Sequence, residues 1–345
     1  MKVSNLMKQK PCYILAIESS CDDTAAAILR NDEVLSNIIA TQDVHKKYGG
    51  VVPELASRAH QQNIIPVVDQ AIHQAGITKK ELNAIAYTRG PGLLGSLLVG
   101  TSFAKSLAMG LDVPLIDVNH MQAHLLVHFI KDEFPVPTFP FIGVTVSGGH
   151  TQIVKVKDYL DFELLGTTLD DAIGEAFDKC GKVLGLGYPA GPAIDKKAKS
   201  GNPKAFDFPI PNTLNLDLSF SGFKTAVINF IHKNTQKDKH FIEENINDLC
   251  ASIQYTLIEI IFQKIEKAVN LYNLTQIVLG GGVSANSGLR SKLEKAAQEK
   301  GWDVYLPPLA YTTDNAAMIG IVGYIKYLNK DFGTVRESAS ARLKF

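Results

Sequence analysis

Two histidines four residues apart are the clearest candidate metal ligands in this sequence. His120 and His124 form an H-x-x-x-H pattern, and in a helix this spacing places both imidazoles on one face, where they can bind one ion. A zinc peptidase of the H-E-x-x-H type needs a glutamate directly after the first histidine as general base, but Met121 stands there. The pattern therefore favours either a metal site that lacks the peptidase base or two half-buried helix residues.

Asp314 is the candidate third ligand. It precedes a run that indicates a helix, within YTTDNAAMIG (311–320), so its carboxylate could bind the ion or could cap that helix. Two histidines and one carboxylate leave coordination positions open for substrate oxygens, and such a set suits Fe²⁺, Mn²⁺ or Zn²⁺. The residue types do not choose among these ions.

Two glycine-rich turns are candidate anion sites. Gly280–Gly282 and the following residues to Asn286 lead into an expected helix over 283–298, whose first N–H groups and dipole would favour a phosphate or adenylate. The turn Ser147–Gly149 offers the same close approach of backbone to a ligand. In both turns the glycines could instead serve only a tight strand connection.

Carboxylates between residues 168 and 199 are candidate ribose ligands. Glu175 and Asp178 follow a helical pattern with Lys179, and Asp195 follows a loop rich in Gly and Pro. A carboxylate is the usual partner of a vicinal diol, although each of these acids could also lie on a solvated helix face.

Two other motifs resemble nucleotide-binding signatures but carry little weight. Gly90 to Gly95 fits G-x-G-x-x-G after a strand, yet it lies deep in the chain after another hairpin, where a dinucleotide-binding domain would not normally place it. Ser221 to Thr225 resembles the end of a phosphate loop, but Phe223 separates Gly from Lys and the upstream Gly is missing. No Walker A motif is present.

The elements that would position these residues occur twice. Residues 14–29 and 142–156 each read as strand, small polar turn and strand, about 130 residues apart. Downstream of each hairpin, residues 84–108 and 276–297 read as strand, glycine-rich turn and helix. Parallel strand–helix units predict an α/β fold that binds ligands at the carboxyl ends of its strands, and the repetition predicts two duplicated lobes.

Length and composition agree with two lobes in a reducing compartment. A chain of 345 residues exceeds the roughly 250–300 residues at which one core stops growing, and the proline-rich stretch 131–141 suggests a boundary. The four cysteines contain no C-x-x-C pair, which argues against a zinc ribbon or disulfide framework. No segment approaches the ~20 apolar residues of a membrane span, and we expect a cytoplasmic protein with a short N-terminal tail.

The charge balance limits nucleic-acid binding. Lys plus Arg and Asp plus Glu each number 35, so no overall positive field holds nucleic acid, and such a partner would need a local patch or helper proteins. Residues 231–245 are expected to be a solvated helix end or loop. The C-terminal residues 332–345 have little apolar periodicity and predict a loosely held tail, with a tRNA contact through Arg336, Arg342 and Lys344 as the alternative.

An ordered set of motifs gives the chain a family resemblance. In sequence order these are E-S-S-C-D-D-T, Y-G-G-V-V-P-E-L-A-S-R-x-H, G-P-G-L-L-G-S-L-L-V-G, H-M-Q-A-H, V-S-G-G-H-T, G-E-A-F-D-K, S-F-S-G-F-K-T, G-G-V-S-A-N and T-D-N. Over about residues 14 to 325 the chain resembles the TsaD family, also called Gcp, of tRNA N6-adenosine threonylcarbamoyltransferases.

The resemblance implies an α/β, actin/Hsp70-like (ASKHA) fold of two duplicated lobes with the ligand site in the cleft between them. The lobes would comprise residues 1–130 plus 311–345, and residues 131–310. The implied reaction moves a threonylcarbamoyl group from threonylcarbamoyl-AMP to N6 of adenosine 37, 3′ to the anticodon, in tRNAs that read codons beginning with A, and releases AMP.

The resemblance also implies residue roles and partners. His120, His124 and Asp314 look like ligands of one divalent ion, first of all Fe²⁺. The set that resembles the family's adenylate site is Thr145, Val146, Ser147, Gly148, Gly149, Asp178, Gly191, Asp195 and Asn286. The implied partners are tRNA, threonylcarbamoyl-AMP, a TsaB-like protein and a TsaE-like ATPase, with no membrane.

The general base is left open, with Glu18, Asp22 and Asp23 on the first hairpin as candidates. Two positions depart from the family's common pattern. Ala190 replaces a glycine beside Gly191, which is tolerated unless its φ is positive, and Asp23 replaces a glutamate. The competing interpretations are a metallopeptidase, a sugar or acid kinase of the same fold, and a nucleotide-binding scaffold whose partners perform the chemistry.

Overall fold

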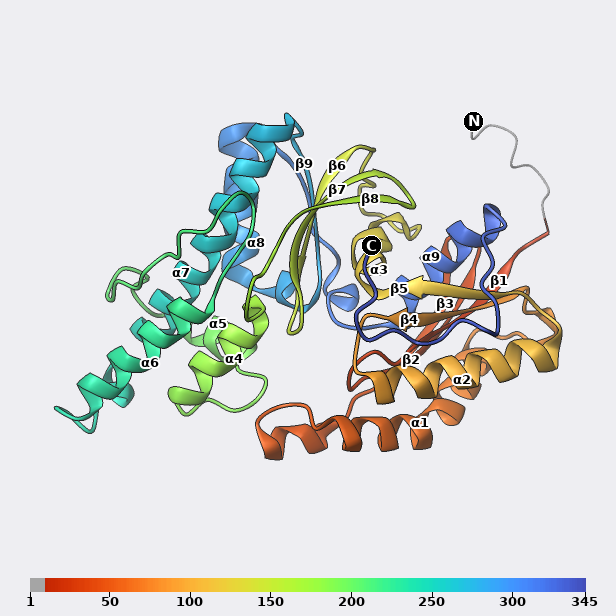
Figure 1. Ribbon diagram of the computed structural model, residues 1–345, viewed down its shortest axis with the longest axis horizontal. Coiled ribbons are helices and arrows are strands. Elements are labelled where there is room, and N and C mark those ends of the chain that lie inside the picture. Colours follow the sequence, from red (N-terminus) through yellow and green to blue (C-terminus); the bar gives the residue numbers. More distant parts are fainter. Residues whose placement is uncertain (1–9) are drawn as a thin grey trace. The chain divides into compact units, whose positions relative to one another are not determined.

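A computed structural model describes residues 10–345 (Figure 1). Most of the expected N-terminal tail lies outside this range. The chain divides into two compact units. The first contains the described residues up to Gln42, then Pro53–Phe134 and Asp314–Lys344, and the second contains Asp43–Val52, Pro135–Thr313 and Phe345. Both units are therefore discontinuous in sequence.

The sheet of the first unit has the order β3-β2-β1-β4-β5. β1, β2 and β3 are antiparallel, whereas β4 and β5 continue from β1 in parallel. The hairpin predicted over 14–29 is confirmed, with Ile14 opposite Leu29. The strands are β1 (Tyr13–Glu18), β2 (Thr24–Arg30), β3 (Glu33–Ala40), β4 (Ala84–Gly90) and β5 (Leu115–Asn119).

The sheet of the second unit repeats this topology. Its order is β10-β9-β6-β7-β8, with β6, β7 and β8 antiparallel and with β9 and β10 parallel to β6. The central strand, the antiparallel pair and the parallel pair thus recur in the same sequence order, which confirms the predicted duplication. The strands are β6 (Phe141–Val146), β7 (Thr151–Asp158), β8 (Asp161–Thr167), β9 (Gln276–Gly280) and β10 (Asp303–Tyr305).

Helices cover both faces of the first sheet. α1 (Pro53–Gln74) and α2 (Leu94–Leu111) pack on one face, and α3 (His120–Leu126) and α9 (Ala316–Leu328) lie on the other (Figure 1). Strand residues that point toward α1 and α2, among them Leu15, Ile85 and Tyr87, are fully buried. Their burial supplies the main free energy that holds these layers together.

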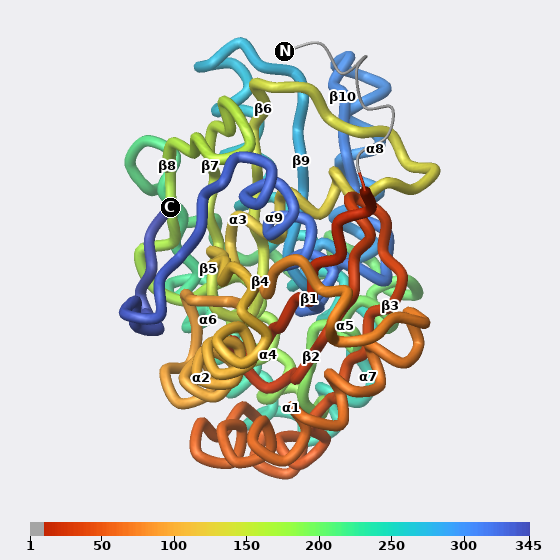
Figure 2. Tube along the Cα trace, turned by 90° about the vertical axis from the view of Figure 1, so that its right-hand side faces the viewer, coloured from red at the N-terminus to blue at the C-terminus, as the bar shows by residue number. Residues whose placement is uncertain are grey.

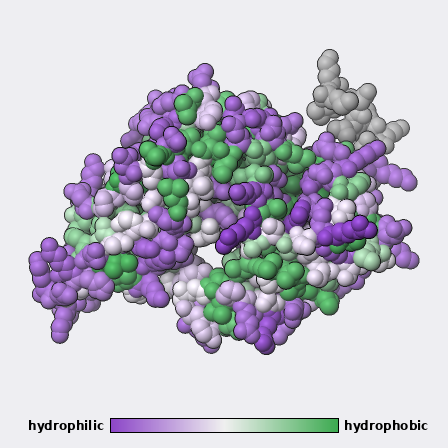
Figure 3. All heavy atoms as spheres, viewed as in Figure 1, coloured by the Kyte–Doolittle hydropathy of each residue, from purple (hydrophilic) through white to green (hydrophobic). Residues whose placement is uncertain are grey.

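Among residues 10–345, α2 is the one helix long and apolar enough to cross a membrane. With 18 residues, α2 comes close to the length of a membrane span, contrary to the expectation that no segment would. However, α2 is a surface helix of the first unit: it packs on β4 and α1 and buries Leu97 and Ala104 there, while about a third of its residues are buried. Exposed apolar side chains gather over α1 and α2 (Figure 3), including Ile65, Leu98 and Met109.

The helices of the second unit are α4 to α8. The polar stretch 231–245 contains the end of α6 and the start of α7, as expected. The helix predicted over 283–298 begins later, because a short 3₁₀ turn (Gly282–Ala285) precedes it and the Asn286 side chain accepts the backbone N–H of Leu289. The bounds are α4 (Ile173–Val183), α5 (Gly191–Ala198), α6 (Ser221–Thr235), α7 (Phe241–Tyr272) and α8 (Ser287–Lys300).

The prediction of a loosely held C-terminal tail is wrong. The segment, dark blue in Figure 2, is held on β4 and β5 by backbone hydrogen bonds. Ser340 N–H donates to the carbonyl of Arg89, Gly92 N–H donates to that of Ala341, and the Asn119 amide donates to that of Lys344 at 3.0 Å. Main-chain contacts of this kind need no apolar side chains, so hydropathy did not reveal them.

Gly90→Ala should loosen this segment. Gly90 has φ +152°, and a Cβ there would lie 1.9 Å from the carbonyl oxygen of Ser340, so the segment or the strand must move. We expect a loss of about 1–3 kcal/mol in unfolding free energy, measured by denaturant titration, and faster tryptic cleavage after Arg336. Gly110→Ala is the control, since a Cβ at this position in α2 meets nothing within 4 Å. Unchanged cleavage in Gly90→Ala would contradict the expectation.

Candidate metal centre

The local structure of the metal centre begins with the cap of α3. The Asn119 side chain, at the end of β5, accepts the backbone N–H groups of Met121 (2.9 Å) and Gln122 (3.3 Å). The chain therefore turns directly from strand to helix, and His120 is the first helical residue. His120 and His124 are buried, with ring centroids 4.7 Å apart. The predicted helix with both imidazoles on one face is confirmed.

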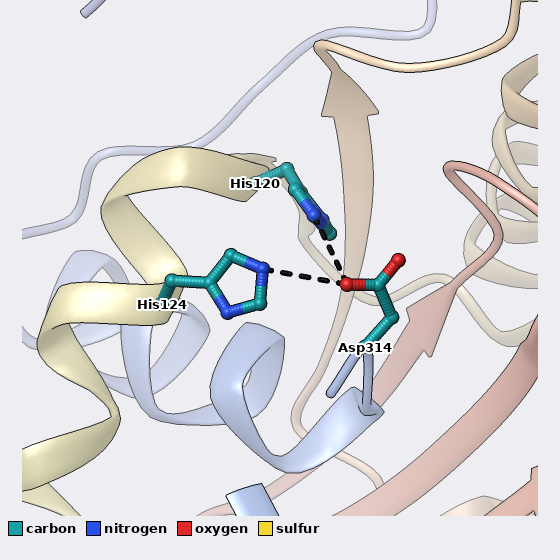
Figure 4. A group of neighbouring side chains, drawn as sticks. All are labelled: His120, His124 and Asp314. Atoms are coloured by element: carbon teal, nitrogen blue, oxygen red, sulfur yellow. Dashed lines mark ion pairs between the residues drawn. The ribbon is translucent and has the colours of Figure 1, made fainter. Parts of the chain in front are cut away.

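Asp314 faces both histidines. It begins Asp314–Lys344, the last segment of the first unit. Its Oδ1 lies 3.4 Å from His120 Nε2 and 3.3 Å from His124 Nε2 (Figure 4). The alternative that Asp314 merely caps α9 is wrong, because Asn315 occupies the cap position and accepts the Met318 N–H at 3.0 Å. The carboxylate is thus left to face the imidazoles.

The three side chains fit a divalent metal ion. One ligand atom from each lies within 4.8 Å of the others. Among the described residues, neither ring nitrogen of the fully buried His124 has a hydrogen-bond partner, since its 3.3 Å contact with Asp314 lacks hydrogen-bond geometry. A buried polar group normally has a partner, and an ion would supply it. Two histidines and one carboxylate are a known ligand set for ions of this kind.

Glu18 contacts Nδ1 of His120, whereas Asp314 faces the other ring nitrogen, Nε2. Its Oε2 accepts the Thr88 hydroxyl at 2.6 Å and lies 3.0 Å from His120 Nδ1, and its Oε1 accepts the Ser20 N–H. A carboxylate can only accept there, so Nδ1 carries the hydrogen and Nε2 is free for an ion. With both oxygens bonded and no exposed surface, Glu18 is placed to orient His120.

The charges of the cluster depend on each other. Burial lowers the pKa of His120, but the carboxylates of Glu18 and Asp314 outweigh burial and raise it well above its ordinary value. Burial and, to a smaller extent, the charge of His120 lower the pKa of His124 by more than Asp314 raises it. Burial raises the pKa of Asp314, yet His120 and His124 lower it far below its usual range. Without an ion, one proton on His120 therefore neutralises part of the negative charge.

Asp22 and Asp23 lie in the turn from β1 to β2, in the same unit. Burial and the charges of Asp22 and Asp314 raise the pKa of Asp23 to about 7. Its Oδ1 is buried and has no hydrogen-bond partner among the described residues. Burial and the neighbouring carboxylates also raise the pKa of the Cys21 thiol, so this cysteine is a poor nucleophile.

The predicted adenylate residues all lie in the second unit. Thr145 and Val146 end β6, and Ser147–Gly149 form the turn to β7, where Ser147 N–H donates to the carbonyl of His150 at 2.9 Å. Gly174 at the start of α4 packs on this turn, since a Cβ there would lie 2.8 Å from Gly148 Cα.

Hydrogen bonds connect the elements that carry Asp178, Gly191, Asp195 and Asn286. Asp178 Oδ1 accepts the Ala190 N–H at 2.7 Å, directly before Gly191 begins α5. Asp195 accepts the hydroxyl of Ser287 at 2.8 Å, next to Asn286. The structure thus connects α4, α5 and the cap of α8, which carry the four predicted residues.

The methyl group of Ala190 is accommodated without strain. Its φ is −85°, a value that any L-residue adopts. Its Cβ packs on Gly181 of α4, where an added Cβ would lie only 2.2 Å away. The expectation that alanine is tolerated at this position is confirmed.

Several residues that hold the site were not foreseen from the sequence. Ser20 and Thr88 bind Glu18, and Gln254 accepts the Asn286 amide at 2.8 Å. Asn119 had a usable signal, because an asparagine directly before a helix is a preferred cap. Thr88 and Gln254 are single polar residues whose partners lie 70 and 32 residues away in sequence. Ser20 is only two residues from Glu18, but no local pattern marks its N–H as the donor to that carboxylate.

Solved structures share the fold of this chain. The topology matches solved structures of actin/Hsp70-like proteins. HypF in a phosphate- and nucleotide-bound form is similar with a TM-score of 0.62 and 13% identity, over 95% of this chain and 48% of that one. Component A of the (R)-2-hydroxyglutaryl-CoA dehydratase of Acidaminococcus fermentans has a TM-score of 0.53 and 16% identity, over 92% of this chain and 97% of that one. These likenesses show the fold.

Sequence relatives show the family. A model of the TsaD family, tRNA N6-adenosine threonylcarbamoyltransferase, matches residues 33–321. Proteins with this name from Christiangramia forsetii and Riemerella anatipestifer are 62% and 58% identical, over 98% and 96% of this chain and 100% and 98% of theirs. The chain belongs to the tRNA N6-adenosine threonylcarbamoyltransferase family.

Glu18→Gln should weaken metal binding. The amide keeps the shape of the side chain but replaces the charged acceptor of His120 Nδ1–H, and such partners behind a ligand typically contribute 10–100-fold in affinity. We expect a Kd for Co²⁺ about 10–100 times higher, measured by visible absorption. Glu33→Gln, in an exposed pair with Arg30, should bind Co²⁺ like the unmodified protein. Equal affinity in Glu18→Gln would contradict the placement of Glu18.

Metal binding should strengthen as the pH rises. The ion must displace the proton that the flanking carboxylates hold on His120, so affinity should rise about tenfold per pH unit up to the raised pKa. Calorimetry near pH 7 in buffers of different ionisation enthalpy should show about one proton released per ion. An affinity that does not change between about pH 6 and 8 would show that His120 is already neutral.

Proposed function

We propose that the chain transfers a threonylcarbamoyl group from threonylcarbamoyl-AMP to N6 of adenosine 37 in tRNAs that read codons beginning with A, and releases AMP. Family membership over nearly the whole chain supports the reaction. The single structural observation that carries it is the cluster of the buried His120 and His124 with the partly exposed Asp314. We also propose that the two units correspond to the lobes 1–130 plus 311–345 and 131–310.

The proposed metal ligands are His120, His124 and Asp314, and the proposed ion is Fe²⁺, with Zn²⁺ and Mn²⁺ as alternatives. A bound ion would act as a Lewis acid on the carbamoyl carbonyl. The role of the chain's own residues here is orientation: Glu18 fixes the tautomer of His120, and Asn119 fixes the first turn of α3.

The proposed adenylate site is Thr145 to Gly149 together with Asp178, Gly191, Asp195 and Asn286. Support comes from the two exposed glycines of the turn, Gly148 and Gly149. A Cβ added to either would meet no atom within 4 Å, so a ligand can approach their backbone closely. Backbone N–H groups of such a turn can bind phosphate oxygens. Asp195 is proposed to contact the ribose. Asp178 is proposed to hold the loop before Gly191, through its bond to the Ala190 N–H.

In the proposed reaction, N6 of adenosine forms a bond to the carbamoyl carbon, AMP leaves, and N6 loses a proton. An exocyclic amine is a weak nucleophile, so positioning contributes more than a strong base. Of the three candidates for accepting the proton, Glu18 is bonded on both oxygens. Asp22 and Asp23 are the better candidates, and the raised pKa of Asp23 suits proton transfer near neutral pH.

The proposed partners follow from the family and from the charge. With equal numbers of acidic and basic residues, the chain has no large positive field to hold tRNA by itself. We therefore propose that TsaB-like and TsaE-like proteins assist it, and that it works in the cytoplasm. A scaffold role, with the chemistry in a partner, is the alternative to be tested.

The test is nucleoside mass spectrometry of unmodified tRNA incubated with threonylcarbamoyl-AMP and the partner proteins. His120→Ala and His124→Ala should lower threonylcarbamoyladenosine formation by about 10²-fold or more, the effect of losing a group that stabilises developing charge. His128→Ala is the matched control, because His128 continues the four-residue spacing but is not part of the metal cluster found in residues 10–345. Full product with the His120 and His124 variants would favour the scaffold.

A further inference from the structure

The loop that leaves β1 connects the metal cluster to two surface helices. It runs from Ser19 to Asp23, between β1 and β2. Ser19 donates its hydroxyl to the carbonyl of Ser96 in α2 at 3.0 Å, and the carbonyl of Ser20 accepts the Leu93 N–H at 2.7 Å. The loop is therefore clamped on one side by the start of α2.

His60 of α1 clamps the other side of the loop. Its side chain is fully buried, with Nε2 at 2.9 Å from the carbonyl oxygen of Cys21 and Nδ1 at 2.8 Å from the hydroxyl of Thr24. A carbonyl oxygen can only accept. The contact with Cys21 therefore places a hydrogen on Nε2, and in the neutral imidazole this leaves Nδ1 as the acceptor for Thr24.

The carbonyl of Cys21 is the point at which the two helices meet the loop. It accepts His60 Nε2–H and also the Ser96 hydroxyl, at 2.9 Å each. Both lone pairs of this oxygen are thus used, one by α1 and one by α2. Loss of the His60 donor would leave the peptide group held from one side only.

Hydrogen bonds continue from this loop to the metal ligands. Ser20, which directly precedes Cys21, donates its N–H to Glu18, and its hydroxyl lies 3.3 Å from His120 Nδ1. Glu18 in turn lies 3.0 Å from the same nitrogen. A shift of the Cys21 peptide would therefore move the groups that orient His120.

We propose that His60 is a positioning residue of the metal centre, which acts by holding the Cys21 carbonyl and, through Ser20 and Glu18, the imidazole of His120. The inference rests on the proposed metal site. His60 itself does not bind the ion, because both of its ring nitrogens are engaged elsewhere. A purely structural histidine would affect stability but not the affinity for the ion.

Three substitutions separate these roles. Glutamine carries its amide nitrogen as many bonds from Cβ as His60 carries Nε2, so His60→Gln keeps the donor to Cys21. His60→Asn can keep only the acceptor for Thr24, and His60→Leu keeps neither. We expect the Leu and Asn variants to raise the Kd for Co²⁺ about tenfold, the lower end for groups behind a ligand, and the Gln variant to restore most of the affinity.

The measurement is a Co²⁺ titration of the full chain followed by visible absorption, with thermal unfolding recorded for each variant. His45→Leu is the matched control, since His45 is equally buried but lies in the second unit, where it accepts the Val52 N–H at 3.2 Å. It should lower Tm without changing the Kd for Co²⁺. Equal Co²⁺ affinity in His60→Leu and the unmodified protein, or a Gln variant as weak as the Leu variant, would overturn the proposal.

Two further measurements apply, ¹⁵N NMR of His60 and Co²⁺ binding by His120→Ala. If His60→Leu does not fold, ¹⁵N NMR of the unmodified protein must show His60 protonated on Nε2 and not on Nδ1, and the opposite tautomer would overturn the proposal. If His120→Ala binds Co²⁺ as tightly as the unmodified protein, the metal site itself fails, and the role of His60 fails with it. Tight binding that depends on His120 but not on His60 refutes the positioning role alone.

Discussion

Burial of charge at one place governs how the first unit is built. Glu18, with no exposed surface, and Asp314 both contact His120, and two carboxylates this close in a buried site need positive charge between them. A protonated His120 or a cation supplies it. The elements that carry these groups must therefore meet at one place, which requires β1, the start of α3 and Asp314, directly before the cap of α9, to converge.

The sheet topology satisfies this requirement with neighbouring parallel strands. β1, β4 and β5 run in parallel, so their carboxyl ends lie at one edge, and Glu18, Thr88 and His120 come from the ends of these three strands or the residue after them. The second unit repeats the arrangement, with Thr145 at the end of β6 and Asn286 after β9. The repeated topology thus gives each unit polar groups at the same edge of its sheet.

The repeated hairpins, the strand–glycine–helix units and the histidine pair could be predicted because each depends on a local pattern. Asp314 could be found but not assigned, since an aspartate before a helix is also a good cap, and only the structure shows Asn315 in that role. From the sequence, Glu18 could only be named as a candidate base. Its contact with His120 joins residues 102 positions apart, so no local pattern reveals it. The C-terminal segment was misjudged because it is held through peptide groups, which every residue possesses and no pattern distinguishes.

The division of the chain has a consequence for its synthesis. β1 to α3 are translated first, but Asp314 and α9 follow only after the long segment Pro135–Thr313 of the second unit. At roughly 5–20 residues per second, this insertion takes about ten to forty seconds. During that interval the nascent first unit has one sheet face without α9 and its two histidines without their carboxylate. An uncovered sheet face of this kind favours aggregation of the nascent chain until α9 has been synthesised.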